Sequence, residues 1–226
     1  MTDPIVSNQR SRPPIKLLVG VFFISMLVSG IIIYLILDQV IDNDTTSDYT
    51  EFVLESEGGV RIIDPPRTVA DFTLTSHTGE AVSISDLRGQ NVMLYFGYLN
   101  CPDVCPLTLM DLQEVDSIIG DQIDNMAYVY VSVDGERDTP EVMANYLQRR
   151  QMDDMVIGLT GEEVILERIT PDYGLFYQLN EPQENGFYSV DHTASLFFLN
   201  TEGELARIFA YGTDPAVIAE AIIALQ

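Results

Sequence analysis

Two cysteines, the only ones in the chain, lie four positions apart in the stretch CPDVCP, residues 101–106. Thiols at this spacing allow three kinds of chemistry: a structural disulfide, a redox dithiol, or a pair of soft ligands for a metal ion. A disulfide across so short a loop stabilises little, so a purely structural role is the weakest of the three. Redox dithiols more often have two intervening residues, and this motif has three. The redox and metal-binding interpretations both stay open.

Prolines follow both cysteines directly, at Pro102 and Pro106. A proline disfavours the helical region for the residue before it, so we expect Cys101 and Cys105 to lie in a looped turn that opens a helix, not inside a helical turn. In such a loop the two sulfurs can come within bonding distance. The N-terminus of the following helix carries partial positive charge, which favours the thiolate form of a nearby cysteine.

A metal site needs more donors than two sulfurs, and the candidate third ligand is a histidine. Two thiolates alone suit Cu(I), and an added nitrogen ligand lets a site hold Cu(II) as well. His77 lies in the hydrophilic stretch SHTGE and is expected in a surface turn. His192 directly precedes an apolar run, where a histidine is more often a hydrogen-bonded structural residue. It becomes a ligand candidate if its strand lies beside the strand that precedes Cys101.

The segments around these residues predict strands that alternate with helices. Strands are expected at two places within 71–89 and at 91–98, 126–133, 155–159, 194–200 and 205–211. Helices are expected from Pro106, from Pro140 after the cap Thr139, after a capping box of Thr160 and Glu163, and from Pro215 after the cap Asp214. This order implies a mixed α/β sheet covered by helices on both faces. The cysteines fall at the C-terminal end of a central strand, where sites collect in open α/β sheets.

The charge balance of the chain excludes one class of partner. The sequence has 35 acidic and 11 basic residues, which leaves a formal net charge of −24. Nucleic acids are bound through their phosphates by clustered Lys and Arg side chains, so we expect no nucleic-acid partner. With 46% hydrophobic residues and regular apolar patterning, the chain is expected to form one ordinary domain with a full core.

Residues 17–37, LLVGVFFISMLVSGIIIYLIL, contain no charged side chain and predict a transmembrane helix. At about 1.5 Å per residue a helix of this length reaches about 31 Å, which covers a bilayer core of roughly 30 Å. A cleaved signal peptide has a shorter apolar region, so we expect an uncleaved, single-pass anchor. Arg10, Arg12 and Lys16 precede the segment and acidic residues follow it, which by the positive-inside rule keeps the N-terminus in the cytoplasm.

These features divide the chain into four expected parts. Residues 1–16 are a cytoplasmic tail and residues 17–37 are the anchor. Residues 38–66, rich in Asp, Glu, Ser and Thr with one Gly-Gly and one Pro-Pro pair, are an acidic, solvated tether. Residues 67–226 are the folded domain. The expected location is the inner membrane of a bacterium with the domain facing the periplasm, or the intermembrane space in a mitochondrion.

Three stretches, GYLNCPDVCP at 97–106, VDGERDTPEVM at 133–143 and DHTASLFFLN at 191–200, resemble in this order the Sco (SenC) family of copper-delivery proteins. The resemblance covers roughly residues 60–226 and includes the N-terminal anchor. It implies a thioredoxin-like α/β fold, with a mixed sheet flanked by helices and an extra β-hairpin. It also implies one bound copper ion and a role in assembling the binuclear copper centre of cytochrome c oxidase subunit II.

Carried over by position, the resemblance implies that Cys101 and Cys105 are thiolate ligands of the copper ion and that His192 is its imidazole ligand. The family often has Thr-His directly before the first cysteine, whereas this chain has Leu99–Asn100. The difference removes one potential extra nitrogen ligand and leaves the three core ligands in place.

Three acidic residues are candidates for supporting roles around these ligands. Asp134 and Asp138 match the D-x-x-x-D segment that lies near the site in the family, although Asp138 can equally be only an acid at the start of a helix. Asp191 can accept a hydrogen bond from His192 or can face water. Gly135 stands where the family usually has proline, which is expected to loosen the loop without removing an acid.

The resemblance implies a copper metallochaperone and not an enzyme. With both thiols reduced, the domain would take copper from a periplasmic donor and pass it as Cu(I) or Cu(II) to the oxidase subunit, while the membrane anchor raises the effective concentration. The alternative is a membrane-anchored thiol-disulfide oxidoreductase that uses Cys101 and Cys105 as a redox pair, accepts electrons from a thiol reductant, and keeps the cysteines of the oxidase copper site reduced. This alternative does not need His192.

Overall fold

The computed structural model describes residues 26–27, 29–31, 34 and 56–225. The expected cytoplasmic tail, most of the expected anchor at 17–37, and the tether up to residue 55 lie outside the described residues. Within the described residues no helix combines the length and apolar character needed to span a bilayer. The chain divides into two compact units, Met1–Glu51 and Phe52–Gln226, and the second unit contains both cysteines and both histidines.

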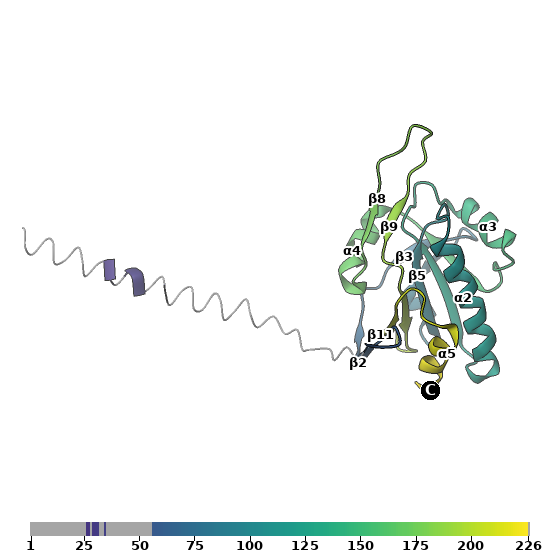
Figure 1. Cartoon of the computed structure of the whole chain (residues 1–226), viewed down its shortest axis with the longest axis horizontal. Coiled ribbons are helices and arrows are strands. Elements are labelled where there is room, and N and C mark those ends of the chain that lie inside the picture. Colours follow the sequence, from purple (N-terminus) through teal and green to yellow (C-terminus); the bar gives the residue numbers. More distant parts are fainter. Residues whose placement is uncertain (1–25, 28, 32–33, 35–55, 226) are drawn as a thin grey trace, which may run out of the picture. The chain divides into compact units, whose positions relative to one another are not determined.

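The second unit is built on one mixed sheet with the strand order β1-β2-β11-β10-β5-β6-β7-β3-β4 (Figure 1). Its strands are β1 (Ser56–Glu57), β2 (Val60–Thr68), β3 (Thr73–Ser76), β4 (Ala81–Ser83), β5 (Asn91–Gly97), β6 (Met126–Ser132), β7 (Val156–Thr160), β10 (Leu196–Leu199) and β11 (Glu204–Phe209). Strands β5, β6 and β7 run parallel, and the other neighbours pair antiparallel. Outside this sheet, β8 (Tyr177–Leu179) and β9 (Val190–His192) form a separate antiparallel ribbon.

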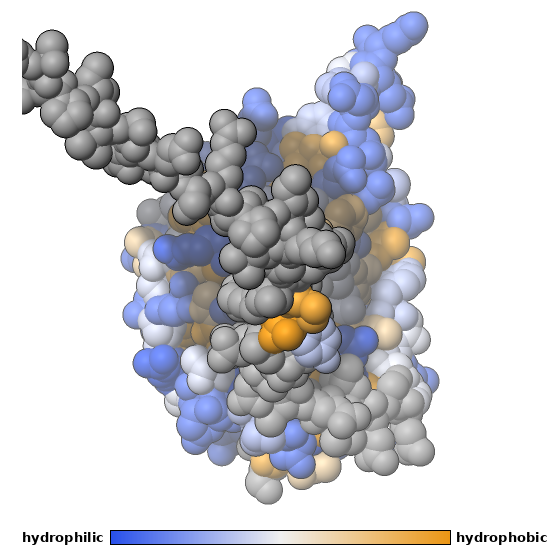
Figure 2. All heavy atoms as spheres, turned by 90° about the vertical axis from the view of Figure 1, so that its left-hand side faces the viewer, coloured by the Kyte–Doolittle hydropathy of each residue, from blue (hydrophilic) through white to orange (hydrophobic). Residues whose placement is uncertain are grey.

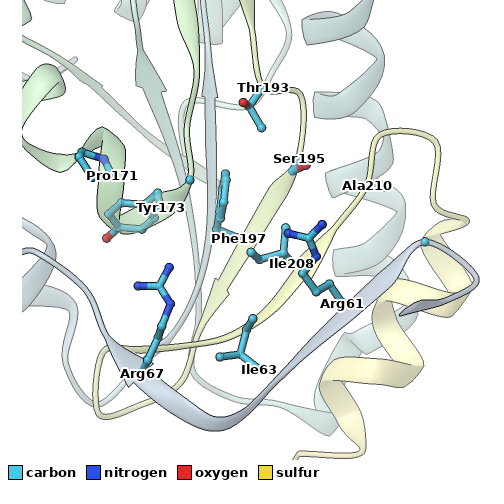
Figure 3. A pocket seen from close by; sticks show the side chains of 12 residues that line it. Arg61, Ile63, Arg67, Pro171, Tyr173, Thr193, Ser195, Phe197, Ile208 and Ala210 are labelled. Carbon is cyan, nitrogen blue, oxygen red and sulfur yellow. The ribbon is translucent and has the colours of Figure 1, made fainter. Parts of the chain in front are cut away.

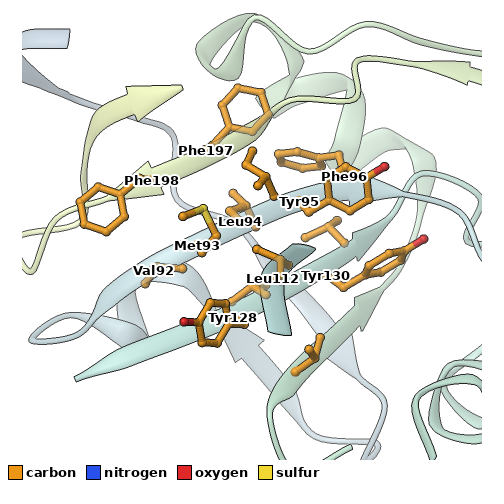
Figure 4. Close-up of a cluster of buried hydrophobic side chains, with 14 of the residues drawn as sticks. Val92, Met93, Leu94, Tyr95, Phe96, Leu112, Tyr128, Tyr130, Phe197 and Phe198 are labelled. Carbon is orange, nitrogen blue, oxygen red and sulfur yellow. The ribbon is translucent and has the colours of Figure 1, made fainter. Parts of the chain in front are cut away.

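The centre of the sheet is strand β5, whose seven residues are all buried. Successive side chains of a strand point to opposite faces, and here both faces are packed with aromatic rings (Figure 4). On one face the ring of Tyr95 lies 5.6 Å from that of Tyr130 in β6. On the other face the ring of Phe96 lies 5.4 Å from Tyr173 and 5.7 Å from Phe197. A continuous apolar run therefore becomes a strand that is buried on both sides.

Helices cover both faces, as the sequence predicts. They are α2 (Val104–Ile119), α3 (Pro140–Arg149), α4 (Glu163–Tyr173) and α5 (Pro215–Ile223). Helices α2, α3 and α5 lie on one side of the sheet and α4 lies on the other (Figure 1). The caps Thr139 and Asp214 are confirmed, since each side chain accepts a hydrogen bond from the first turn of its helix. The mixed α/β architecture is confirmed.

Two local expectations differ from the structure. The capping box is wrong: α4 starts after Glu162, because Thr160 is the last residue of β7 and is buried there. The tether was expected to run to residue 66, whereas β2 already starts at Val60 and pairs with β11. The Pro65–Pro66 pair fits this strand because it lies in an irregular stretch of the ladder, between the paired residues Ile62 and Arg67.

One face of the described part is largely hydrophilic. On the face seen in Figure 2, hydrophilic residues cover much of the described surface and apolar residues appear in small groups. A cavity of about 480 Å³ lies over β2, β10 and β11 beside α4 (Figure 3). Its lining includes Arg61, Arg67, Tyr173 and Phe197, and it does not include either cysteine or either histidine.

Candidate metal centre

Cys101, Cys105 and His192 meet at the C-terminal end of β5. One sulfur from each cysteine and one ring nitrogen of the histidine all lie within 4.8 Å of one another, and the Cys105 Sγ is 3.5 Å from the His192 Nε2. Among the described residues this is the only group of three or more Cys, His, Asp or Glu side chains placed in this way. The sequence makes His192 a ligand candidate only if its strand lies beside the strand that precedes Cys101. This is the case, because β10, which follows His192, pairs with β5 along its length, with Leu196 opposite Tyr95.

The helix that follows β5 begins earlier than the prolines predict. Helix α2 starts at Val104, with the Asp103 side chain accepting a hydrogen bond from the Val104 N–H at 2.6 Å. Cys105 therefore lies in the first helical turn, and the expectation of a loop at this residue is wrong. Pro106 is tolerated there because the first N–H groups of a helix have no partner inside the helix. Cys101 lies outside the helix, and its sulfur accepts a hydrogen bond from the Cys105 N–H at 3.4 Å.

The two thiols have different surroundings. Cys105 is completely buried, Cys101 is partly exposed, and both are free. Burial raises the pKa of Cys105 to about 12, and hydrogen bonds to its sulfur oppose this rise only in part. For Cys105, burial therefore opposes the thiolate form that the helix N-terminus is expected to favour. A metal ion that binds here must displace the Cys105 proton.

His192 is held in the form that a metal ligand needs. Its Nδ1 lies 3.1 Å from the carbonyl oxygen of Thr193, to which it donates, and this leaves Nε2 without a proton and directed toward Cys105. Burial lowers the pKa of His192, which favours the neutral imidazole. The acceptor is thus the Thr193 carbonyl and not the carboxylate of Asp191, which lies on an exposed position of the ribbon.

A cavity of about 380 Å³ leads to the site. Cys101 and His192 line it together with Tyr98, Asp103 and Phe187, whereas Cys105 lies behind them and does not reach it. Two sulfurs and a neutral imidazole nitrogen form a soft, three-donor set, which suits Cu(I) and, through the nitrogen, also Cu(II). The residues at this position can therefore hold one copper ion that enters from the side of Cys101 and His192.

Asp138 supports the loop that carries Cys101. Its carboxylate is fully buried and accepts hydrogen bonds from the Leu99 N–H at 2.9 Å and from the Ser132 hydroxyl at 2.6 Å. Burial raises the pKa of Asp138, and these two hydrogen bonds favour the charged form. Asp138 is not the cap of α3, since Thr139 is. Its position tightens the turn between β5 and Cys101.

Asp134 anchors the segment that leads to His192. Its buried carboxylate pairs with Arg137 and accepts a hydrogen bond from the Tyr188 hydroxyl at 2.8 Å. Arg137 also donates to the Tyr188 carbonyl at 2.9 Å and places its guanidinium 3.4 Å from the centre of the Tyr188 ring. The D-x-x-x-D pattern points to Asp134 in the sequence. Nothing in the neighbourhoods of Arg137 and Tyr188 predicts their contact, because the two residues are 51 positions apart.

Gly135, which stands where the family resemblance expects proline, lies against a second glycine. A Cβ atom at position 135 would be 2.0 Å from the carbonyl oxygen of Gly161, far below a contact distance. The lack of a side chain therefore lets the loop after β6 pack against the segment after β7. The expectation that glycine merely loosens this loop does not account for the contact.

Replacing Arg137 with glutamine is expected to destabilise the domain by about 2–4 kcal/mol, because the buried Asp134 carboxylate loses its charged partner. Chemical denaturation followed by circular dichroism measures the change. Arg150→Gln is the matched control: Arg150 stacks on Tyr146 at 3.7 Å and has no buried carboxylate to leave behind, so about 1 kcal/mol or less is expected. Equal losses in the two variants would contradict a special role for Arg137.

Comparison with known proteins places this site in a wider group. The model of the SCO1/SenC family matches residues 61–226, which include all three candidate ligands. The human protein called Protein SCO1 homolog, mitochondrial, is 33% identical over 166 residues, which cover 72% of this chain and 54% of that protein. The match thus spans about half the length of the human relative.

Solved structures agree with this fold. The structure described as Bradyrhizobium japonicum ScoI with copper bound is 32% identical, with a TM-score of 0.61 and coverage of 70% of this chain and 99% of that chain. BsSco, described as a member of the Sco family of cytochrome c oxidase assembly proteins, is 20% identical with a TM-score of 0.57, over 72% of this chain and 95% of that chain. The second likeness shows the fold alone. Together with the strand order, these matches confirm the thioredoxin-like α/β fold.

Proposed function

The chain belongs to the SCO1/SenC family, and from this premise we propose that it is a copper metallochaperone. It binds one copper ion, as Cu(I) or Cu(II), through Cys101, Cys105 and His192 and delivers it to the binuclear copper site of cytochrome c oxidase subunit II. The observation that carries the proposal is the convergence of two sulfurs and one imidazole nitrogen within 4.8 Å. The copper-bound relative from Bradyrhizobium supports the metal, and the description of the Sco family as cytochrome c oxidase assembly proteins supports a role in oxidase assembly.

Transfer proceeds by stepwise exchange of ligands. An incoming copper ion meets Cys101 and His192 first, because these two side chains line the cavity. Cys105 then loses its proton and completes the site from the buried side. In delivery the order reverses. Ligands of the recipient enter through the cavity and replace Cys101 and His192, and Cys105 dissociates from the metal last. Both thiols must be reduced, so copper loading also depends on the redox state of the pair.

Membrane attachment is part of this proposal. The uncharged segment at 17–37 would anchor the chain in the inner membrane with its N-terminus in the cytoplasm, and the acidic tether would hold the domain on the outer side. The recipient subunit is held by the same membrane, so tethering raises the effective concentration of the two partners. A periplasmic copper donor or thiol reductant would supply the domain from the aqueous side.

A second function has its own support in the site. The two thiols are free, close together and differently exposed, with Cys101 accessible and Cys105 buried. This asymmetry suits a thiol-disulfide oxidoreductase in which Cys101 attacks a disulfide of the oxidase copper site and Cys105 resolves the mixed disulfide. The electrons would come from a thiol reductant that reduces the resulting Cys101–Cys105 disulfide.

Oxidase assembly in cells distinguishes the two functions. In a host that lacks its own copy of the protein, the chain carrying His192→Ala is compared with the chain carrying Cys101→Ser and Cys105→Ser. Delivery predicts that both variants lose most of the oxidase activity, because the first lacks the imidazole donor that Cu(II) needs and the second lacks both thiolates. If the His192→Ala chain restored full activity while the cysteine variant failed, the reductase function would replace the delivery function.

Copper affinity is expected to rise with pH. Because burial raises the pKa of Cys105 to about 12, this thiol is protonated at neutral pH, and Cu(I) must displace its proton. Each unit of added pH lowers the competing proton concentration, so the apparent association constant rises about tenfold per unit from this group alone. Competition with a Cu(I) chelator of known protonation measures the slope. Cys105→Ser should lose this part of the slope, and a flat profile for the unmodified chain would contradict the expectation.

A further inference from the structure

The buried side of the Cys105 sulfur contacts a tyrosine hydroxyl. The Tyr95 side chain is completely buried, and its hydroxyl lies 3.4 Å from the Cys105 Sγ, in hydrogen-bonding range for sulfur. His192 Nε2 approaches the same sulfur at 3.5 Å. A thiolate that binds a metal has no proton to donate, so in the loaded site Tyr95 must be the donor of this hydrogen bond.

The packing around Tyr95 gives this hydroxyl little freedom. A Cβ atom at Gly97 would stand 2.8 Å from the Tyr95 ring, 2.8 Å from the Tyr130 hydroxyl and 3.0 Å from the Cys105 sulfur. The three groups can crowd together only because position 97 has no side chain. The Tyr130 ring packs edge-on against Tyr95 at 5.6 Å, yet its own buried hydroxyl has no hydrogen-bond partner in the described part of the chain.

We propose that Tyr95 tunes the oxidation-state preference of the copper site through its hydrogen bond to the Cys105 sulfur. The inference rests on the proposed copper-binding function and adds a positioning residue to it. A hydrogen bond to a ligating thiolate withdraws electron density from the sulfur, which weakens its donation to the metal. Cu(II) depends on that donation more than Cu(I) does, so the hydrogen bond favours Cu(I).

The geometry explains why a tyrosine is suited to this role. The ring fills the core between β5 and α2, so the hydroxyl is carried to the sulfur on a rigid support with no exposed atom. Cys105 does not line the cavity, so the donor to its sulfur on this side is the Tyr95 hydroxyl and not water from the cavity. The contact therefore acts on the buried ligand and leaves the accessible pair, Cys101 and His192, free for exchange with a partner.

The test is Tyr95→Phe in the full chain, which removes one oxygen and keeps the ring. Chelator competition gives the Cu(I) and Cu(II) association constants, and the visible spectrum gives the sulfur-to-Cu(II) charge-transfer band. We expect the ratio of the Cu(I) to the Cu(II) constant to fall about three- to tenfold, the worth of one hydrogen bond, and the band to move to longer wavelength. Both constants are measured on the same folded protein, so the ratio does not depend on the fraction that folds.

Tyr130→Phe is the matched control. It also removes a buried hydroxyl close to the Cys105 sulfur, but the Tyr130 hydroxyl makes no hydrogen bond. Its ratio and its band should equal those of the unmodified chain. An unchanged ratio and band in Tyr95→Phe, or equal shifts in the two variants, would overturn the inference. An unmodified chain that binds no copper would instead overturn the proposed function, so the two failures are distinguishable.

Discussion

Replacing Cys101 and Cys105 together with serine is expected to lower the affinity for Cu(I) by more than about 10⁴-fold, so that the purified chain no longer carries stoichiometric copper. The two sulfurs are the soft donors of the site, and a serine hydroxyl is a hard donor that stays protonated at neutral pH. Serine nearly matches cysteine in size, so the loss reports on chemistry more than on packing. Metal content after loading and dialysis measures it, together with loss of the charge-transfer absorption.

The single variants separate the two sulfurs. Cys101→Ser removes the accessible ligand and Cys105→Ser removes the buried one, and each is expected to weaken Cu(I) binding strongly because only one soft thiolate donor remains in place of two. Thermal unfolding of each apo variant shows whether the fold is intact. A doubly substituted chain that kept one tightly bound copper ion would show that the metal binds elsewhere, and the proposed site would be wrong.

Replacing His192 with alanine is expected to lower Cu(II) affinity by about 100-fold or more while Cu(I) affinity falls by about tenfold or less. Two thiolates alone can hold Cu(I), whereas Cu(II) needs the imidazole nitrogen as a further donor. His192 also contacts the Cys105 sulfur at 3.5 Å, so its removal opens the site to water from the cavity. Calorimetry for Cu(II) and chelator competition for Cu(I) give the two affinities.

The other histidine provides the control for this experiment. His77 lies in the turn between β3 and β4, and its Nδ1 accepts a hydrogen bond from the Gly158 N–H at 3.2 Å. His77→Ala should cost some stability and leave both copper affinities unchanged. If His77→Ala weakened Cu(II) binding as much as His192→Ala does, the assignment of His192 as the third ligand would not hold.

The alternation of strands and helices could be predicted because it depends on neighbouring residues. Apolar runs such as 91–97 and 126–132 fit strands buried on both faces, and the Thr139 and Asp214 caps mark the starts of two helices. Strand β2 was missed because its polar residues and its prolines resemble a linker, and only its pairing with β11 makes it a strand. Strand β9 was missed because three residues carry no periodicity of their own.

In the candidate site, too, some features follow from neighbouring residues and others from the pairing of distant segments. The spacing of Cys101 and Cys105 and the position of His192 before a buried strand made them candidates, and the family resemblance implied them as ligands. Their meeting depended on β10 lying beside β5. The contact between Arg137 and Tyr188 joins two segments that are 51 positions apart and show no relation in the sequence.

By itself the sequence determined which donor atoms this protein has, the family they resemble and the order of the elements that carry them. Only the tertiary structure decided that Cys105 is a buried thiol with a raised pKa, that Asp138 and Asp134 support loops, and that Tyr95 contacts the sulfur. The physical reason is that propensity and motif belong to consecutive residues. Desolvation, distance and hydrogen-bond partners arise only when distant parts of the chain pack against one another.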